Sequence, residues 1–456
     1  MAKSKTIYVC QNCGAEFPKW MGKCSACGEW NTLTEEVTIT GKNKTSGRIA
    51  THSTGRHKPL PVSSVSVEDV PRIDTCIGEL NRVLGGGLVP GSLVLLGGEP
   101  GIGKSTLVLQ MALKLFSKKI LYVSGEESPR QIKLRAERLS NVDGDHCFLV
   151  GETSLEQTIV HIENINPDLV IIDSIQTMER EALESIPGSV SQIRECTVSI
   201  LRVAKEKNIP VLLIGHINKE GSLAGPKVLE HIVDVVLQFE GDGQNMYRIL
   251  RAIKNRFGST SEIGIFEMHG EGLREVINPS EMLLGHHEEE LSGIAIAAAL
   301  EGIRPFLIEV QALASTAAYG TPQRTSTGFD LRRLNMLLAV LEKRAGFKLA
   351  AKDVFLNIAG GFKVSDPAVD LAVVASILSS NTDLVIPHKI CLTGEVGLSG
   401  EIRPVGRIEQ RVTEAEKLGF ESIVVPRYQR GVNFEKFNIK VIQTAKIEEA
   451  FRFLFS

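Results

Sequence analysis

The chain has 456 residues, of which 43% are apolar and 23% charged, and its formal net charge is −3 at pH 7. This composition is typical of a water-soluble α/β protein with more than one domain, and the near-neutral charge gives no overall signal for a nucleic-acid partner. Because the sequence has no run of 18 apolar residues and no signal-peptide core at its start, we expect a cytoplasmic protein with no membrane partner.

Four cysteines near the N-terminus have the spacing C-x2-C-x10-C-x2-C. Two cysteine pairs on tight turns supply four thiolates for a tetrahedral Zn²⁺ site, and a reducing compartment disfavours the alternative of disulfides. Residues 1–31 are therefore predicted to form a zinc finger that the metal must fold. Residues 32–67 are polar and basic and are expected to be a linker. The expected zinc ligands are Cys10, Cys13, Cys24 and Cys27.

Residues 68–275 alternate short β-rich runs with helical patterns, which predicts βαβ units and a mostly parallel sheet. The segment 262–276 is expected to form a hairpin that turns at 270–272. A second α/β region is expected at 286–456. The expected strands of the first region are 92–96, 119–124, 169–173, 210–215 and 233–239.

The stretch GEPGIGKS, residues 98–105, matches the pattern G-x-x-x-x-G-K-[ST]. Glycines let backbone N–H groups wrap a polyphosphate, and the following helix directs its positive end at the same anion. Lys104 is expected to reach the β- and γ-phosphates of ATP, and the Ser105 hydroxyl to bind Mg²⁺. A glycine-rich turn is the alternative, which the position between an expected strand and an expected helix at 104–116 disfavours. The residues expected to bind ATP are Gly98, Glu99, Pro100, Gly101, Ile102, Gly103, Lys104, Ser105 and Thr106.

Acidic residues stand at or just after the ends of two other expected strands. The buried-strand pattern LVIID ends at Asp173, which is expected close to the Mg²⁺ ion, with a strand-end cap as the alternative. The strand at 119–124 is followed by Glu126 and Glu127, and one of them is expected to polarise the water that attacks the γ-phosphate. The pattern alone does not choose between the two; the other is then a solvated loop acid.

These motifs together resemble the RecA-type ATPase core: the phosphate loop, a strand followed by Gly-Glu-Glu-Ser, and VIIDSIQT at 170–177. With the four-cysteine module and the pentapeptide KNRFG at 254–258, the whole chain resembles the bacterial RadA (Sms) family of DNA-repair and recombination ATPases, which is distinct from the archaeal recombinase of similar name. The expected fold class is α/β, with an N-terminal zinc ribbon, a RecA-like P-loop ATPase domain with a mostly parallel sheet, and a C-terminal Lon-protease-like α/β domain.

The resemblance implies an ATP-dependent motor of homologous recombination and DNA repair. Members of the family bind single-stranded DNA and promote branch migration of recombination intermediates. They are similar in architecture to hexameric replicative helicases, which implies a homohexameric ring with single-stranded and branched DNA as partners. A recombinase and other repair proteins are further candidate partners. Glu126 matches the catalytic glutamate of RecA-type cores. A nucleotide-switched DNA-binding scaffold without translocation is the alternative.

The segment YRILRAIKNRFG at 247–258 alternates apolar and basic residues and ends in two cations, Lys254 and Arg256. Such a pair at a strand end could complete the ATP site of a neighbouring subunit, as an arginine finger does. A solvated basic loop fits the pattern equally well. Only the resemblance, which implies that both cations support nucleotide and DNA functions, favours the catalytic interpretation.

Two segments are candidates for DNA binding, 176–196 and 216–231, because RecA-type cores bind DNA through loops at these places. Both carry Gly and Pro, as mobile loops do, and Lys219 and Lys227 lie in the second. Neither contains Phe, Tyr or Trp, so binding is expected to be electrostatic, sequence-tolerant and salt-dependent. His216 is interpreted either as a sensor of the bound nucleotide or as a core histidine.

From about residue 290 the chain resembles the C-terminal domain of Lon protease. An ungapped comparison places Val369 where that family has its nucleophilic serine, and Glu409 where it has its lysine. Valine offers no nucleophile, and Ser365 and Lys417 stand at the wrong distance from the motif, so we expect a proteolytically inactive domain kept for assembly. A second DNA-binding surface is a further hypothesis, with solvated helix faces as the alternative for the basic residues Arg304, Arg324, Arg332, Arg333, Lys343 and Arg344.

Overall fold

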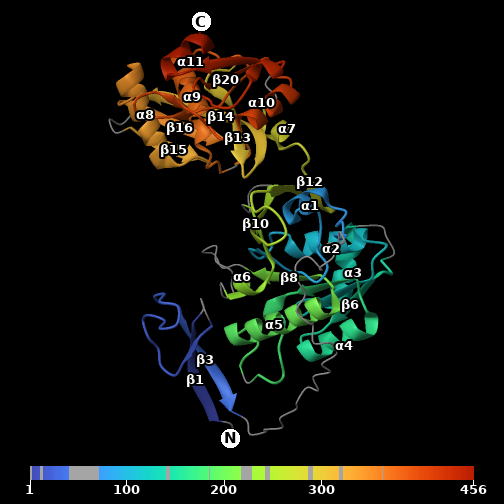
Figure 1. Cartoon of the computed structure of the whole chain (residues 1–456). Helices are drawn as coiled ribbons and strands as arrows, with labels where there is room; N and C mark the ends of the chain where they lie inside the picture. Colours follow the sequence, from blue (N-terminus) through green and yellow to red (C-terminus); the bar gives the residue numbers. More distant parts are fainter. Residues whose placement is uncertain are drawn as a thin grey trace. The chain divides into compact units, whose positions relative to one another are not determined.

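The computed structural model describes residues 3–10, 14–40, 71–139, 144–183, 185–216, 228–241, 247–285, 291–317, 322–361 and 363–455. It divides into two compact units, Met1–Glu275 and Val276–Ser456 (Figure 1). Among the described residues, no helix combines the length and the apolar character needed to cross a membrane.

The N-terminal segment is a three-stranded antiparallel sheet in the order β2-β1-β3. Strand β1 (Lys3–Cys10) pairs along its whole length with β3 (Leu33–Thr40), and β2 (Glu16–Phe17) pairs with the end of β1. Strand β3 lies inside the stretch that was expected to be a linker. Its polar composition hid a strand that contains three Thr with one Val and one Ile, all β-branched, and that is held by backbone pairing with β1.

The rest of the first unit is built on a nine-stranded sheet in the order β12-β11-β10-β9-β4-β8-β7-β5-β6. The strands from β9 to β6 in this order are parallel, and β10, β11 and β12 form an antiparallel end. The predicted hairpin is present, with His269 opposite Gly272. The strands are β4 (Leu93–Gly98), β5 (Ile120–Ser124), β6 (Cys147–Gly151), β7 (Leu169–Asp173), β8 (Val211–His216), β9 (Val235–Glu240), β10 (Tyr247–Asn255), β11 (Ile263–His269) and β12 (Gly272–Glu275).

Helices cover both faces of this sheet (Figure 1). Alternate residues of one strand enter different apolar clusters: Val94 and Leu96 of β4 pack with α1, α2 and α3, whereas Leu93 and Leu95 pack with α4 and α5. This two-residue alternation on a doubly covered sheet explains why the central strands read as continuous apolar runs. The helices are α1 (Gly78–Leu84), α2 (Lys104–Lys114), α3 (Pro129–Leu139), α4 (Leu155–Ile165), α5 (Val190–Lys207) and α6 (Val228–Ile232).

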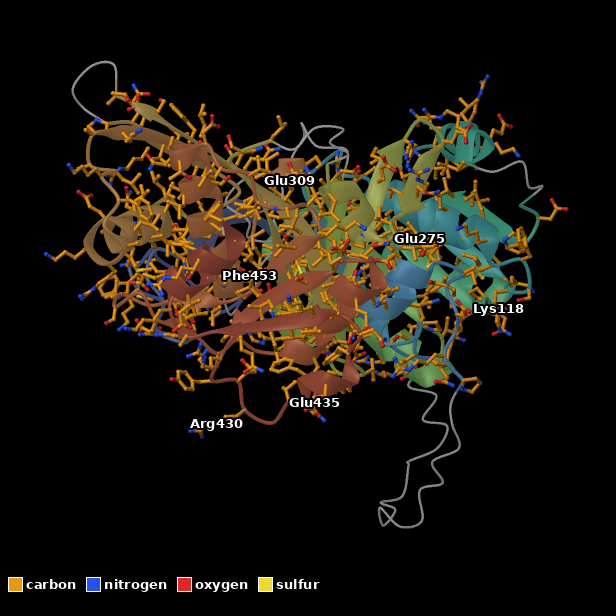
Figure 2. The ribbon with its side chains drawn as sticks, turned by 90° about the horizontal axis from the view of Figure 1, so that it is seen from above. Lys118, Glu275, Glu309, Arg430, Glu435 and Phe453 are labelled. Atoms are coloured by element: carbon orange, nitrogen blue, oxygen red, sulfur yellow. The ribbon has the colours of Figure 1, made fainter. Side chains whose placement is uncertain are left out.

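The second unit has a mixed seven-stranded sheet in the order β15-β16-β14-β13-β17-β20-β21, and a separate pair, β18-β19. Helix α9 is buried along most of its length against β13 and β14. Side chains such as Arg430 and Glu435 extend away from the ribbon (Figure 2). The strands are β13 (Ile294–Glu301), β14 (Arg304–Thr316), β15 (Arg324–Thr327), β16 (Lys352–Ile358), β17 (Ile390–Leu392), β18 (Glu395–Val396), β19 (Ile402–Arg403), β20 (Ser422–Pro426) and β21 (Lys440–Thr444), and the helices are α7 (Pro279–Leu283), α8 (Leu331–Ala345), α9 (Asp370–Thr382), α10 (Ile408–Lys417) and α11 (Ile447–Leu454).

Candidate nucleotide and zinc sites

The phosphate loop connects β4 to α2, as the sequence predicted. Two glycines make the turn possible: Gly103 has φ +111° at the N-cap of α2, and a Cβ atom on Gly98 would stand 2.7 Å from the Phe239 carbonyl oxygen. Lys104, the first residue of the helix, is buried, and its Nζ donates to the carbonyl oxygens of Gly98 at 2.8 Å and Glu99 at 2.9 Å. The loop therefore holds its lysine folded back over the place where a polyphosphate would bind.

The other predicted residues meet at the same edge of the sheet, because β4, β5, β7 and β8 are parallel and their carboxyl ends coincide. Lys104 Nζ lies 3.3 Å from His216 Nδ1, and His216 Nε2 lies 2.9 Å from a Glu126 carboxylate oxygen. Since lysine only donates and carboxylate only accepts, this chain of contacts fits a neutral imidazole with its proton on Nε2. Ser174 Oγ donates to the same Glu126 oxygen at 2.5 Å.

Asp173 ends β7 and is buried at this edge. Its carboxylate accepts a hydrogen bond of 2.7 Å from the Tyr122 hydroxyl. The Ser105 hydroxyl, one residue into α2, and the Asp173 carboxylate are the oxygen donors that Mg²⁺ prefers, so these residues fit a magnesium site. Tyr122 and Ser174 were missed by sequence reasoning; Ser174 directly follows the predicted acid, whereas Tyr122 gave only a strand signal.

The structure gives different surroundings to Glu126 and Glu127, the two acids between which the sequence pattern did not choose. Glu126 faces His216 and Ser174, whereas Glu127 forms an ion pair with Arg135 of α3. The Glu127 backbone N–H also donates to Ser124 Oγ at 3.0 Å. Only Glu126 therefore lies beside the phosphate-loop lysine.

Burial and charge tune the two ionisable groups in opposite ways. Burial lowers the pKa of Lys104 to about 8, although the negative charges of Asp173 and Glu126 oppose the shift. The hydrogen bond from His216, helped by Ser174 and the charge of Lys104, lowers the pKa of Glu126 to about 2 against the effect of burial. At neutral pH the Glu126 carboxylate is therefore ionised, and the neighbouring Lys104 ammonium group has a pKa only slightly above the pH of the solution.

The KNRFG segment lies at the amino-terminal ends of the parallel strands, and the phosphate loop lies at their carboxyl ends. Asn255, at the end of β10, is opposite Val235 of β9, which is opposite Val94 near the start of β4. Four residues of strand, or about 13 Å, separate this level from Gly98. Lys254 and Arg256 therefore lie far from the phosphate loop of their own chain.

Both cations of this segment have partners within the first unit. Lys254 Nζ donates to the carbonyl oxygens of Glu230 at 2.6 Å and Val233 at 2.8 Å, at the C-terminal end of α6, where a cation is favourable. Arg256 lies 3.2 Å from a carboxylate oxygen of buried Asp234, which also pairs with Lys205 at 2.9 Å. Burial and the charge of Arg256 lower the pKa of Lys254.

The two candidate DNA segments differ in what the structure describes. Residues 217–227, with Lys219 and Lys227, lie outside the described residues. The segment 176–196 is less open than expected, because a 3₁₀ turn occupies Ile175–Thr177 and α5 begins at Val190. Its Arg180 lies 3.7 Å from Glu156 and 3.6 Å from Glu195, so this cation is held between acids of the fold.

Three of the four predicted zinc ligands come together in the N-terminal ribbon. The sulfur atoms of Cys10, Cys24 and Cys27 all lie within 4.8 Å of one another, and Cys13 lies outside the described residues. Cys10 Sγ and Cys27 Sγ are 3.7 Å apart. That separation is too long for a disulfide and matches the ~3.8 Å between thiolates at a tetrahedral zinc with Zn–S bonds of ~2.3 Å. The residues present fit Zn²⁺.

The C-terminal unit has no nucleophile at the position compared with the protease serine. Val369 is completely buried in a 3₁₀ turn, and the neighbouring Asp370 forms an ion pair with Arg333. Glu409 on α10 pairs instead with Lys436 at 2.8 Å. Ser365 and Lys417 are exposed.

Two of the basic residues considered for DNA binding are engaged inside the C-terminal unit. Arg304 is 7% exposed and donates to the carbonyl oxygens of Val276 and Ile277. Arg333 is held by Asp370. Arg304 thus donates to backbone carbonyl oxygens and Arg333 pairs with a buried carboxylate, so both have partners inside the fold, and the DNA-surface hypothesis stays a prediction. Arg332, Lys343 and Arg344 of α8 are exposed.

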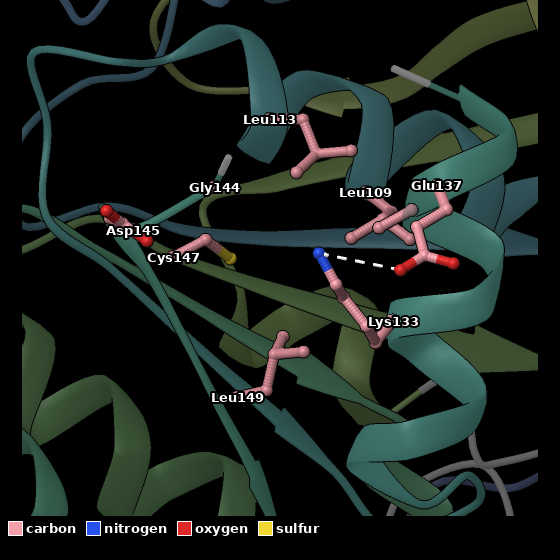
Figure 3. Close-up of a pocket in the computed structure, with 9 residues that line it drawn as sticks. Leu109, Leu113, Lys133, Glu137, Gly144, Asp145, Cys147 and Leu149 are labelled. Carbon is pink, nitrogen blue, oxygen red and sulfur yellow. Dashed lines mark ion pairs between the residues drawn. The ribbon is translucent and has the colours of Figure 1, made fainter. Parts of the chain in front are cut away.

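A separate pocket of about 270 Å³ lies between α2, α3 and β6 (Figure 3). Its walls are mainly apolar, and Lys133 points at Glu137, with 3.8 Å between the charged atoms. Burial raises the pKa of the Cys147 thiol to about 12, so the thiol stays neutral. Cys147 begins β6, opposite Ile120 at the start of β5, so the pocket lies away from the phosphate loop.

Comparisons with known proteins find both family models and solved structures that match parts of this chain. Family models match residues 8–35 (Rubredoxin metal binding domain), 56–222 (AAA domain) and 322–429 (Subunit ChlI of Mg-chelatase). A solved RadB recombinase aligns with 44% of this chain and 99% of its own, with a TM-score of 0.36 and 24% identity.

Much stronger similarity extends over the full length. The DNA repair protein RadA of Bacillus subtilis (strain 168) is 50% identical over 99% of both chains. That of Listeria monocytogenes is also 50% identical over 99% of both, and that of Brucella abortus is 47% identical over 98% of this chain and 97% of its own. The fold class and the resemblance inferred from the sequence are confirmed. The chain belongs to the family of the DNA repair protein RadA.

Proposed function

We propose that this protein is an ATP-hydrolysing motor of recombinational DNA repair that binds single-stranded DNA and promotes branch migration. The observation that carries the proposal is the meeting of Lys104, Asp173, Glu126 and His216 around a phosphate loop, at the carboxyl ends of the parallel strands of one sheet. Phosphate-binding lysine, magnesium-binding acid and water-orienting glutamate are the parts that hydrolysis of a triphosphate needs.

In this proposal each residue has a distinct role. Ser105 and Asp173 would hold Mg²⁺, which supplies neutralisation of phosphate charge. Glu126 would orient the attacking water and accept its proton as the reaction proceeds. Lys104 would leave His216 for the β- and γ-phosphates, so His216 would lose a partner whenever ATP is bound. Since His216 ends β8 and is the first residue of the candidate DNA segment 216–231, this change would link nucleotide state to DNA binding.

Lys254 and Arg256 are proposed to act in the ATP site of the next subunit in a homohexameric ring. Their position at the edge opposite their own phosphate loop supports action in trans. Mixing two inactive variants, Lys104→Ala and Arg256→Ala, tests this directly. In a randomly mixed ring about a quarter of the interfaces would pair an intact loop with an intact arginine, so about a quarter of the ATPase activity should return.

Two controls make the mixing experiment decisive. Lys205→Ala removes the other cation that pairs with Asp234, so it reports the cost of disturbing that pair without removing Arg256. Each inactive variant must also remain inactive alone. Absence of recovery in mixed rings that assemble normally would exclude action in trans.

The motor itself is tested by ATPase rates with and without single-stranded DNA, and by branch migration of a three-stranded junction. We expect stimulation by DNA, steep loss of binding as salt rises, and no junction movement by Lys104→Ala. Slow hydrolysis that DNA does not change, together with retained binding, would instead support a nucleotide-switched scaffold. Failure to hydrolyse ATP would overturn the proposal.

The C-terminal unit is proposed to serve assembly without proteolysis, because buried Val369 offers no nucleophile. A DNA contact through the exposed cations of α8 remains part of the proposal. We place the protein in the cytoplasm, with a recombinase and other repair proteins as candidate partners.

A further inference from the structure

Both tryptophans of the chain lie on the N-terminal ribbon, and both are displayed to solvent. Trp20 is 57% exposed and Trp30 is 67% exposed. They are neighbours across Gly22, where an added Cβ atom would lie 3.8 Å from the ring of Trp20 and 3.7 Å from that of Trp30. Large aromatic rings are usually buried, so two adjacent exposed ones indicate a binding surface.

The fold holds this pair in place. Lys23 and Trp30 form an isolated antiparallel bridge, and the Asn31 backbone N–H donates to the Gly22 carbonyl at 2.8 Å. Cys24 N–H donates to the Glu29 carbonyl, also at 2.8 Å, so the second cysteine pair fixes the same turn. The aromatic surface therefore lies on a hydrogen-bonded turn of the ribbon.

Positive charge accompanies the rings. Lys23 Nζ lies 5.6 Å from the centre of the Trp30 ring, and exposed Lys19 directly precedes Trp20 in the chain. Aromatic rings beside cations are the combination with which proteins bind single-stranded nucleic acid: rings stack on bases, and cations contact phosphates. The candidate DNA segments of the ATPase core contain no Phe, Tyr or Trp, so they offer no such stacking.

We propose that Trp20 and Trp30, with Lys19 and Lys23, form a base-stacking site for single-stranded DNA. This proposal rests on the proposed function, which supplies the DNA strand, and adds a second contact point of different chemistry. Stacking accepts any base because every base has a flat π-face, so the site would be indifferent to sequence. It would hold the strand by its bases, whereas the core would hold it by its phosphates.

Intrinsic fluorescence tests the proposal in the full-length zinc-loaded protein, because all tryptophan emission comes from this surface. Titration with an oligothymidylate should quench the emission in parallel with binding followed by anisotropy of a labelled strand. An abasic oligonucleotide has the same backbone charge without bases and should not quench. Trp20→Ala and Trp30→Ala should each weaken binding by roughly 5- to 100-fold.

Controls separate stacking from folding. Each variant must bind zinc with unchanged stoichiometry, and Trp30→Phe, which keeps a smaller ring, should retain part of the affinity. Tyr428→Ala removes an aromatic residue of the C-terminal unit that is 68% exposed, and should change nothing. If the strand binds without quenching, and both alanine variants bind as well as the parent, this inference is wrong while the proposed function stands. If the parent binds no single strand at all, both fail.

Discussion

The lowered pKa of Lys104 predicts that ATP affinity falls in mildly alkaline solution. Without nucleotide the pKa is about 8, because the ammonium group is buried. A bound triphosphate gives that group an anionic partner, which raises its pKa, so binding must take up a proton above pH 8. With a bound-state pKa near its ordinary value, affinity should be about tenfold weaker at pH 9 than at pH 7, and about half a proton should be taken up at pH 8.

Isothermal titration of ATP in buffers of different ionisation enthalpy measures both quantities. Phosphate groups complete their own titration below this range, so they add little to the slope. Lys104→Arg is the matched control, because a guanidinium stays charged at pH 9 and should abolish the slope even if it weakens binding. A flat affinity between pH 7 and pH 9 in the parent, or the same slope in the arginine variant, would show that Lys104 is not the titrating group.

Three further predictions concern other parts of the chain. Cys24→Ser should abolish zinc binding and unfold the ribbon, measured by metal content and by chemical shifts, whereas Cys76→Ser, at an exposed thiol, should leave both unchanged. Asp234→Asn should lower the free energy of unfolding by about 1–3 kcal/mol in a denaturant titration, because the buried carboxylate loses its ion pairs with Lys205 and Arg256. The loss should stay in this range because both cations can be rehydrated; an unchanged midpoint would contradict a stabilising role of these ion pairs. Val369→Ser should yield no cleavage of fluorogenic peptides, because the new hydroxyl would be buried without a base; any peptidase activity would show that a base and substrate reach this position and would refute this reasoning.

The sites formed by continuous motifs could be predicted because all the residues that determine the local structure are neighbours in the sequence. The phosphate loop, the acid at the end of β7 and the cysteine pairs each combine a residue type with a local backbone shape. The structure places the loop and the acid as expected, and it brings together the three described cysteines of the pairs. Strand β3 was missed because its stability comes from pairing with β1, not from its polar composition. Likewise β6 lies at the edge of the sheet, and its short apolar run, residues 147–150, is only partly buried.

Contacts between distant segments could not be read from the sequence. The choice between Glu126 and Glu127 depends on His216 and Arg135, and His216 is 90 residues away from Glu126. The carbonyl oxygens that hold Lys254 come from the end of a five-residue helix with no strong sequence signal. Arg304 was interpreted as a surface cation because the residues around it in the sequence do not indicate its partners. These partners are the carbonyl oxygens of Val276 and Ile277, 28 and 27 residues away.

The placement of the phosphate loop and the KNRFG segment at opposite edges of one sheet gives each molecule a head and a tail. In the ring proposed above, neighbouring copies would not be related by a twofold axis, and growth would stop only when the rotation between neighbours closes a circle. Every joint in such a circle would contain a nucleotide, so the supply of ATP would govern how firmly the circle holds together. The concentration of ATP in the cell would then decide whether a closed ring around the DNA strand can form.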